Sequence, residues 1–336
     1  MKFQRISLLV GLGLLFYLLH RVGLAAIGRN LAQIGWGFVY VLVLEAVVLT
    51  VNTLAWRATL ADPERVPGLA LGAMRLAGDG VNALVPAAVV GGELLRARLL
   101  SRWVPPAEAL ASVTLAAMTQ FLGQAVFVGL GSLGTEGRGL QPGLRILGAG
   151  IGVFLLLFVA MLARLGGGRR ERGRIGLDGL DRTVGRLLAR FAAEKEFWHD
   201  LKLSVRMAIR DRPRALVLSS ALFALGWSLS VGEVLIVLKL LGSPVPLRTG
   251  LSIAVLAVIV EGTLFFVPGR VGLQEGGLYA IFLVLGLDPA RGLSLGIVRR
   301  LRELASGGCG LLILSFSGRD LPFGGKPQTN LAGFAP

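Results

Sequence analysis

The sequence predicts an all-α polytopic membrane protein, built as an inverted repeat with two re-entrant helical segments that are broken by proline and glycine. The first observation is composition: the 336 residues are 54% hydrophobic and only 16% charged, whereas soluble domains average about 25% charged residues. The second is the length of apolar runs such as "WGFVYVLVLEAVVLTVNTLAW", which reach the roughly 20 residues needed to cross a bilayer. The third is a pair of broken segments, 70–100 and 249–287, described below.

The apolar runs set the order of the unbroken helices along the chain. The first run resembles a signal peptide, but His20 and Arg21 follow it directly and the cleavage signal is poor. We therefore expect an uncleaved first helix, with the N-terminus in the cytoplasm of a bacterium. The helices are expected near 6–19 (with an extension to 26 as the alternative), 36–57, 108–133, 145–164, 215–241 and 291–316.

The stretch 164–214 is predicted to be a basic, amphipathic connector between the two halves of the membrane domain, which spans 1–317. It holds fourteen Lys and Arg residues against seven acids, and such loops stay on the cytoplasmic side. Apolar residues at helical spacing predict helices on the inner membrane surface, in contact with anionic lipid head groups. Residues 318–336 are expected to form a disordered tail.

The two broken segments repeat each other at a fixed offset. Pro86 is followed seven residues later by Glu93, and Pro268 is followed seven residues later by Glu275, so both pairs are 182 residues apart. The positive-inside trace makes 70–100 start and end in the cytoplasm and 249–287 start and end outside. Interrupted helices at corresponding places of two inverted halves are typical of secondary transporters.

Proline and glycine leave backbone amides and carbonyls without helical partners. At membrane depth such groups are costly unless they line a polar cavity, which favours a substrate site, although packing alone is an alternative. The same sites hold ionisable residues, which are expensive inside a membrane and usually functional. The candidate residues for substrate binding or translocation are Asp79, Asn82, Pro86, Gly91, Gly92, Glu93, Arg96, Pro268, Gly269, Arg270, Gly272, Gln274, Glu275, Arg299 and Arg302.

Buried charges are expected in pairs, because a lone charge in the apolar interior is too costly. Arg96 is expected to pair with Glu93 or Asp79, and Glu275 with Arg299 or Arg302. Further ionisable or polar groups fall within membrane segments, and for Arg98, Arg102 and Lys239 snorkelling to the interface is the favoured interpretation. The further groups are Glu45, Asn52, Glu233, Glu261, Arg300 and Glu303.

Composition also argues against several classes of function. The net charge of +15 is explained by basic cytoplasmic loops, so we expect no nucleic-acid partner. One cysteine and two distant histidines make a metal site improbable, and no cofactor is expected. No nucleotide-binding motif is present, so ATP is not expected to drive the protein.

The motifs "NALVPAAVVGGELLRARLL", "FFVPGRVGLQEGGLYAIFLVLGL" and "LSLGIVRRLRELASGGCGLLIL" resemble the transmembrane region of lysylphosphatidylglycerol synthases and the free-standing flippase-like membrane proteins related to it. The second motif and "VRRLREL" are most similar to the branch encoded in hopanoid biosynthesis loci. The resemblance covers about 5–317 and implies a flippase-type fold with a lipid or lipid-linked substrate. Only a short tail follows the last expected helix, so the aminoacyl-transfer domain of the synthases is not expected.

Three hypotheses follow. The first is a translocase or trafficking protein of the inner membrane, for a hopanoid or another glyco- or phospholipid, in which Arg270 or Arg302 holds the head group and Glu93 or Glu275 carries a proton. The second is a non-transporting scaffold that gathers lipid-biosynthesis enzymes through 164–214. The third is a membrane-embedded enzyme, which the absence of histidine near either motif argues against.

Overall fold

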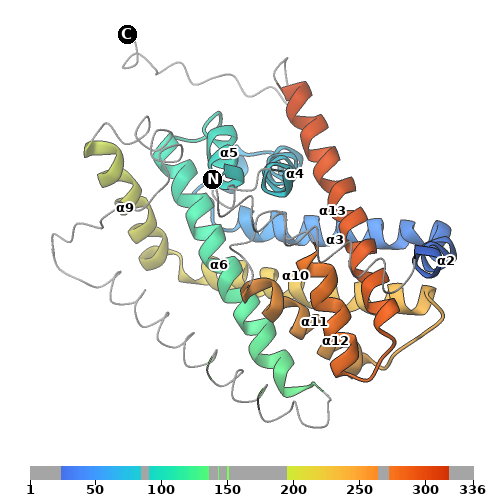
Figure 1. Cartoon of the computed structure of the whole chain (residues 1–336). Coiled ribbons are helices and arrows are strands. Elements are labelled where there is room, and N and C mark those ends of the chain that lie inside the picture. Colours follow the sequence, from blue (N-terminus) through green and yellow to red (C-terminus); the bar gives the residue numbers. More distant parts are fainter. Residues whose placement is uncertain are drawn as a thin grey trace, which may run out of the picture.

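The structure, a computed structural model, describes residues 24–84, 91–135, 143, 150, 195–263 and 272–317, and the regular secondary structure within these ranges is helical (Figure 1). Two short 3-10 turns, η1 (Gly35–Gly37) and η2 (Pro63–Arg65), flank α3. The helices are α2 (Leu24–Ile34), α3 (Phe38–Arg57), α4 (Gly68–Leu84), α5 (Gly91–Leu100), α6 (Pro106–Leu133), α9 (Lys195–Asp211), α10 (Pro213–Leu240), α11 (Leu247–Thr263), α12 (Leu273–Val284) and α13 (Pro289–Ser317).

Prolines begin the three longest helices of the described residues. Pro106, Pro213 and Pro289 are the first residues of α6, α10 and α13. Proline is tolerated there because its missing N–H has no intrahelical partner at that position and its φ angle already suits a helix. Proline thus occupies the first position of these helices, whereas further along the helix it would break the hydrogen bonding.

The helices predicted at 36–57, 108–133, 215–241 and 291–316 are confirmed as α3, α6, α10 and α13. The first broken segment ends α4 at Leu84 and resumes as α5 at Gly91, and the second ends α11 at Thr263 and resumes as α12 at Leu273. The predicted helices 6–19 and 145–164 and the tail 318–336 lie outside the described residues. Helix α2 was not predicted, because its apolar run is short and is interrupted by Arg29 and Asn30.

The long helices carry the features of a multi-pass membrane protein. Three segments, 28–57, 106–133 and 213–240, are long and apolar enough to cross a bilayer by length and composition. Large apolar side chains stand exposed on them, where a soluble protein would place polar ones. Examples are Tyr40 on α3, Phe121 and Leu130 on α6, and Val217 on α10.

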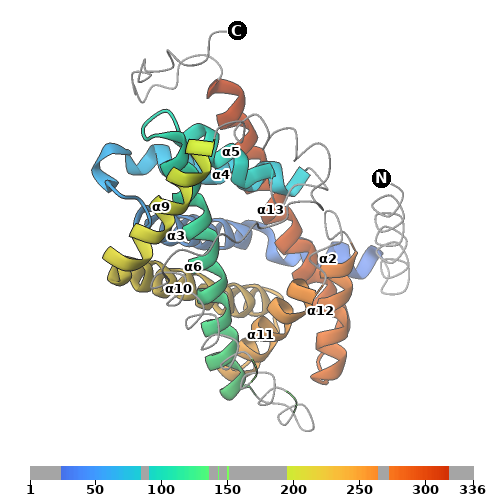
Figure 2. The same cartoon turned by 90° about the vertical axis from the view of Figure 1, so that its left-hand side faces the viewer.

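The four helices of each half recur in the same order, and the first and last corresponding pairs, α3 with α10 and α6 with α13, run in opposite directions. Helices α3, α4, α5 and α6 correspond to α10, α11, α12 and α13 at the offset of 182 residues, and their ends agree within about three residues except that α10 begins seven residues earlier than α3 would place it. Figure 1 shows α3 and α10 running in opposite horizontal directions, and α6 descending where α13 rises. The turned view in Figure 2 shows the same opposition of α6 and α13. This arrangement agrees with the predicted inverted repeat.

The halves are joined by a close crossing of α4 and α13. A Cβ atom added at Gly310 would collide with the carbonyl oxygen of Leu76, and one added at Gly80 would lie 2.7 Å from the carbonyl oxygen of Gly307. Only glycine lets two helix backbones approach this closely. The crossing brings the end of α4, just before the first break, against the charged part of α13.

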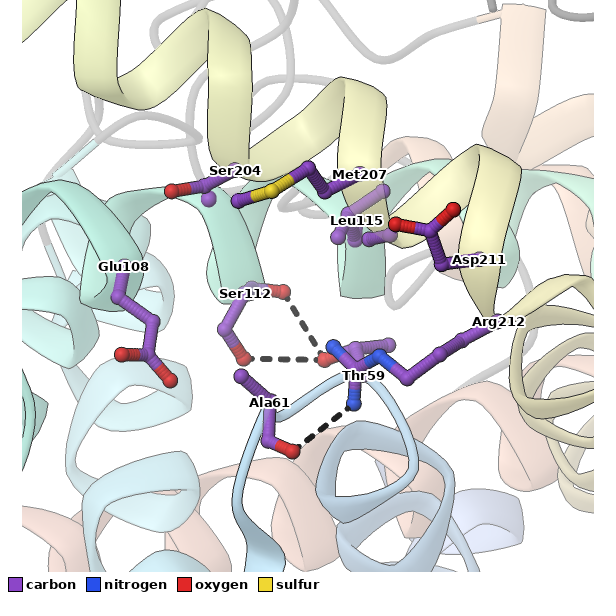
Figure 3. A pocket seen from close by; sticks show the side chains of 11 residues that line it. Thr59, Ala61, Glu108, Ser112, Leu115, Ser204, Met207, Asp211 and Arg212 are labelled. Atoms are coloured by element: carbon purple, nitrogen blue, oxygen red, sulfur yellow. Dashed lines mark hydrogen bonds between the residues drawn. The ribbon is translucent and has the colours of Figure 1, made fainter.

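Helix α9 is the described part of the predicted connector, and it packs against α6 and the start of α10. A cavity of about 270 Å³ lies between α9, α6 and the turn that follows α3. Figure 3 shows Arg212, at the junction of α9 and α10, directed to that turn, where it donates to the carbonyl oxygens of Leu60 and Ala61. The connector is thereby attached to the first half.

Candidate functional site

One arginine spans the first break. Arg96 on α5 donates to Asp79 on α4 and to Glu93 on its own helix, each over 2.5 Å. Its Nη2 also lies 3.4 Å from the carbonyl oxygen of Arg75 on α4. The side chain of Arg96 is buried, whereas those of Asp79 and Glu93 are partly exposed. The predicted pairing of Arg96 is confirmed with both carboxylates, and the ion pairs link the helices on either side of the break.

The start of α5 is closed by an amide side chain from α4. The Oδ1 atom of Asn82 accepts a hydrogen bond from the backbone N–H of Gly92 over 2.9 Å. The first N–H groups of a helix have no intrahelical acceptor, so this bond satisfies one of them. A Cβ atom at Gly92 would collide with Asn82 and with the carbonyl oxygen of Gly78, so the contact requires glycine there. Gly91 is the first residue of α5.

The start of α12, after the second break, is capped in a different way. Gly272 has a φ of 77°, in the left-handed region that glycine favours, and its N–H donates to Oε2 of Glu275 over 2.8 Å. The other carboxylate oxygen, Oε1, lies 3.1 Å from Nε of Arg300. Gln274 donates to Glu303 on α13 over 3.1 Å. Glu275 is thus fixed by its own helix start and by α13.

The predicted partner of Glu275 was wrong, because the structure pairs it with Arg300 in place of Arg299 or Arg302. The reason is the face of α13 on which α12 packs. A Cβ atom at Gly296 would lie 3.0 Å from the Cα atom of Glu275, so this face of α13 contacts α12. Residues four apart share a helix face, and Arg300 is one turn beyond Gly296.

Arg299 and Arg302 instead bind carboxylates from three other helices. Arg299 lies 3.1 Å from Glu233 on α10 and 3.6 Å from Glu261 on α11. Arg302 lies 3.1 Å from Glu45 on α3 and 3.1 Å from the second oxygen of Glu233. Arg299 and Glu233 are both almost fully buried. Arg299, Arg300 and Arg302 of α13 therefore bind carboxylates of α3, α10, α11 and α12, and the ion pair between Arg302 and Glu45 links the second half to the first.

The two breaks have carboxylates at corresponding positions, but the arginines that bind them lie on different helices. Asp79 and Glu261 are 182 residues apart, as are Glu93 and Glu275, so each break has one carboxylate before it and one after it. In the first half a single arginine on α5 binds both carboxylates. In the second half two arginines of α13 bind them separately.

Sequence reasoning missed one buried charge of the site. Arg75 on α4 is 5% exposed, and its guanidinium contacts Gln120 on α6 over 3.4 Å and lies 5.4 Å above the ring of Phe223 on α10. A cation over an aromatic face is attracted by the ring's quadrupole. The run "LALGAMRLAG" could have revealed Arg75, because an arginine surrounded by apolar residues in a membrane segment is unusual.

The structure thus brings most candidate residues together around the breaks. Asp79, Asn82, Gly92, Glu93 and Arg96 meet at the first, and Gly272, Gln274 and Glu275 meet at the second with Arg300 and Glu303. Arg299 and Arg302 form a separate group with Glu45, Glu233 and Glu261. Pro86, Pro268, Gly269 and Arg270 lie outside the described residues.

Comparison with known proteins identifies the family of the chain. The profile of the family described as "Lysylphosphatidylglycerol synthase TM region" matches residues 4–307. The chain is also similar to a protein described as "UPF0104 membrane protein" from Methanothermobacter thermautotrophicus (strain ATCC 29096 / DSM 1053 / JCM 10044 / NBRC 100330 / Delta H). The two are 27% identical over 281 residues, which cover 78% of this chain and 80% of the relative. No solved structure was found to match. The family match includes all but the end of the helical domain, and the chain belongs to the family of the lysylphosphatidylglycerol synthase transmembrane region.

Proposed function

We propose that the protein moves a lipid between the leaflets of the bacterial inner membrane, or passes a lipid on within it, with its N-terminus in the cytoplasm. The observation that carries the proposal is the pair of helix breaks, one in each inverted half, both flanked by carboxylates that form ion pairs with arginines. Helix breaks of this kind form the substrate sites of secondary transporters. The family, named for an enzyme that makes a modified phospholipid, supports a lipid as the substrate.

The substrate class is a lipid with a polar head group, such as a hopanoid or another glyco- or phospholipid. The helix starts at Gly91 and Gly272 point partial positive charge towards the breaks, which suits an anionic part of the head group. Arg302 is already bound by two carboxylates, so it would have to exchange a carboxylate to hold a phosphate. Arg75 is buried, and its guanidinium contacts an amide and an aromatic ring, which makes it the better candidate among the described arginines.

The proposed activity is transport and not catalysis. Lipid-modifying enzymes of the same membrane would supply or consume the substrate. Exposed basic residues of α9, Arg206 and Arg210, are suited to contact anionic head groups at the cytoplasmic surface. No nucleic acid, metal or organic cofactor takes part in the proposal.

The experiment measures lipid distribution across the bilayer. Purified protein is reconstituted into vesicles that contain a head-group-labelled lipid, and a membrane-impermeant reagent reports the outer-leaflet fraction. We expect Glu275→Gln and Arg75→Gln to abolish redistribution while the protein remains inserted and monodisperse. Arg98→Gln is the matched control, because Arg98 is an exposed arginine on α5.

The same assay separates transport from scaffolding. Replacing Arg206 and Arg210 by Gln removes basic charge from α9 without touching the breaks, and we expect redistribution to fall only mildly. If wild-type protein shows no redistribution of any lipid tested, whereas these α9 replacements prevent lipid-modifying enzymes from co-purifying with the protein, the scaffold function would replace the transport function.

A further inference from the structure

The cavity of about 270 Å³ beneath α9 is lined by charged and hydroxyl side chains from separate parts of the chain. On α6 and on α9 the polar lining residues are spaced by one or two helical turns, which keeps them on one face of each helix. The turn after α3 and the junction of α9 with α10 complete the lining. None of these residues lies at either break, so the cavity is separate from the site described above. The polar residues that line it are Thr59, Glu108, Ser112, Ser204, Asp211 and Arg212.

Two buried hydroxyl groups fix the wall of the cavity where α3 ends. Oγ1 of Thr59 and Oγ of Ser112 lie 3.0 Å apart, and Nε1 of Trp56 donates to Ser112 over 3.2 Å. The hydroxyl of Thr59 also donates to the carbonyl oxygen of Trp56 over 2.7 Å. These internal partners form the wall without any ligand. The hydroxyl of Ser204, in contrast, forms no hydrogen bond within the described residues, so it is available to a ligand.

The two carboxylates of the cavity, Glu108 and Asp211, form no ion pair within the part of the chain that the structure describes. Glu108 lies in the first turn of α6, where the helix start stabilises negative charge. Asp211 is the last residue of α9. The carbonyl groups at that end carry partial negative charge, so a carboxylate there is unfavourable unless a cation accompanies it. The cavity therefore lacks a cation beside Asp211.

The guanidinium of Arg212 is only partly engaged by the protein. Its Nη1 atom donates to the carbonyl oxygens of Leu60 and Ala61, whereas Nε and Nη2 form no hydrogen bond within the described residues. Adjacent N–H groups of a guanidinium bind a phosphate through two parallel hydrogen bonds. In the view of Figure 3 the guanidinium lies between Glu108 and Asp211. The lining thus combines one cation with two acids and has a net negative charge.

We propose that the cavity binds a zwitterionic group, a primary ammonium joined by a short chain to a phosphate, and that this group is the head group of an ethanolamine phospholipid. The ammonium donates to Glu108, Asp211 and Ser204, and supplies the cation that Asp211 lacks. The phosphate accepts from the unused N–H groups of Arg212. The inference goes beyond the proposed function, because the cavity lies away from the breaks and binding there needs no transport.

The lining also discriminates against other head groups. A quaternary ammonium is bound best over aromatic faces, and no aromatic side chain lines this cavity. The net negative charge of the lining disfavours an anionic head group. Pockets for drug-sized ligands have volumes of about 300–1,000 Å³, so this cavity is suited to a head group whose acyl chains stay outside. An amphipathic helix such as α9 lies at a membrane surface, which makes a lipid the nearest source of the group.

The test measures lipid binding to the purified full-length protein in detergent by native mass spectrometry. Dioctanoyl phospholipids with ethanolamine, choline or glycerol head groups are titrated in parallel, and we expect the ethanolamine lipid to bind about ten-fold more tightly than the other two. Glu108→Gln and Asp211→Asn should each weaken that binding about ten-fold, because each removes a hydrogen bond to a charged group. Glu64→Gln is the matched control, since Glu64 is an exposed carboxylate outside the lining.

A titration with free phosphoethanolamine distinguishes a lipid from a soluble compound as the source of the group. We expect the lipid to bind more tightly, and equal affinities would overturn the assignment to a lipid. The proposal is also overturned by similar affinities for the three lipids, by a preference for the glycerol lipid, or by binding that both substitutions leave unchanged.

Size-exclusion profiles identify any variant that fails to fold, and the head-group preference of the wild type then decides without it. The binding test is independent of transport. A protein that prefers the ethanolamine lipid as expected but redistributes no lipid would refute the proposed function and leave the cavity site standing.

Discussion

Replacing Arg96 by methionine should destabilise the protein more than the same replacement of an exposed arginine. The change removes a guanidinium that donates to Asp79 and Glu93 over 2.5 Å each and leaves both carboxylates without their cation. Hydrogen bonds to charged groups contribute about 1.5–3 kcal/mol each, and removing one partner of a buried ion pair costs about 3–5 kcal/mol. Both carboxylates are partly exposed to solvent, which offsets part of the loss. We expect a destabilisation of about 3 kcal/mol.

The assay is thermal unfolding of the purified protein in detergent, followed by intrinsic tryptophan fluorescence. A loss of about 3 kcal/mol corresponds to a fall in apparent Tm of about 5 °C for a chain of this size. Arg98→Met is the control on the same helix, because its exposed side chain should change stability by less than about 0.5 kcal/mol. Adding Asp79→Asn and Glu93→Gln to Arg96→Met should restore most of the loss, since no unpaired charge then remains.

Two outcomes would refute this reasoning. One is an equal Tm for Arg96→Met and Arg98→Met, which would mean that water replaces the guanidinium without cost. The other is a triple variant that is less stable than Arg96→Met alone. That result would mean that Asp79 and Glu93 are needed for contacts other than the ion pairs with Arg96.

The remaining predictions concern packing, topology and the connector. Gly310→Ala should lower the Tm by several degrees, because the added Cβ atom would collide with the carbonyl oxygen of Leu76. Gly308→Ala is the control and should leave the Tm unchanged, because no atom lies within 4 Å of a Cβ added there. Similar Tm values for the two variants would contradict the close crossing. In a Cys309→Ala background, Ser243→Cys should react with an impermeant thiol reagent in intact cells, whereas Glu64→Cys should react only after permeabilisation. Reaction of both cysteines from the same side would exclude the inverted topology. Arg212→Ala should speed proteolysis of α9, because Arg212 donates to the carbonyl oxygens of Leu60 and Ala61. Arg214→Ala is the control, and equal rates of proteolysis in the two variants would show that packing alone attaches the connector.

The sequence was sufficient to locate the breaks and the long helices, because both depend on local chemistry. Apolar runs of about 20 residues, and proline and glycine between shorter runs, can be read without knowing any contact. The pairing of Arg96 was also predictable, since Glu93 lies one turn away on the same helix.

The partners of Arg299, Arg300 and Arg302 could not be predicted in the same way. They depend on which face of α13 each neighbouring helix packs against, and that is set by small residues such as Gly296 and Gly310. Arg299 and Arg302 are three residues apart and so share a face of α13, and both contact Glu233, but their spacing does not show which helix that face meets. Arg75 was missed for a simpler reason: it lies before the break and outside the repeated motif.

The uneven placement of the arginines has a mechanical consequence. In the first half, the cation that links the two sides of the break belongs to the broken segment itself, so α4 and α5 can move as one body with their charges still paired. In the second half the cations belong to α13. A rotation of α13 about its axis would therefore carry three positive charges at once past the acids of four helices, while the first break stayed intact. Two halves that repeat each other in order therefore differ in which helix carries the cations of the break, so the same displacement of a helix would keep the ion pairs of the first break and exchange those of the second.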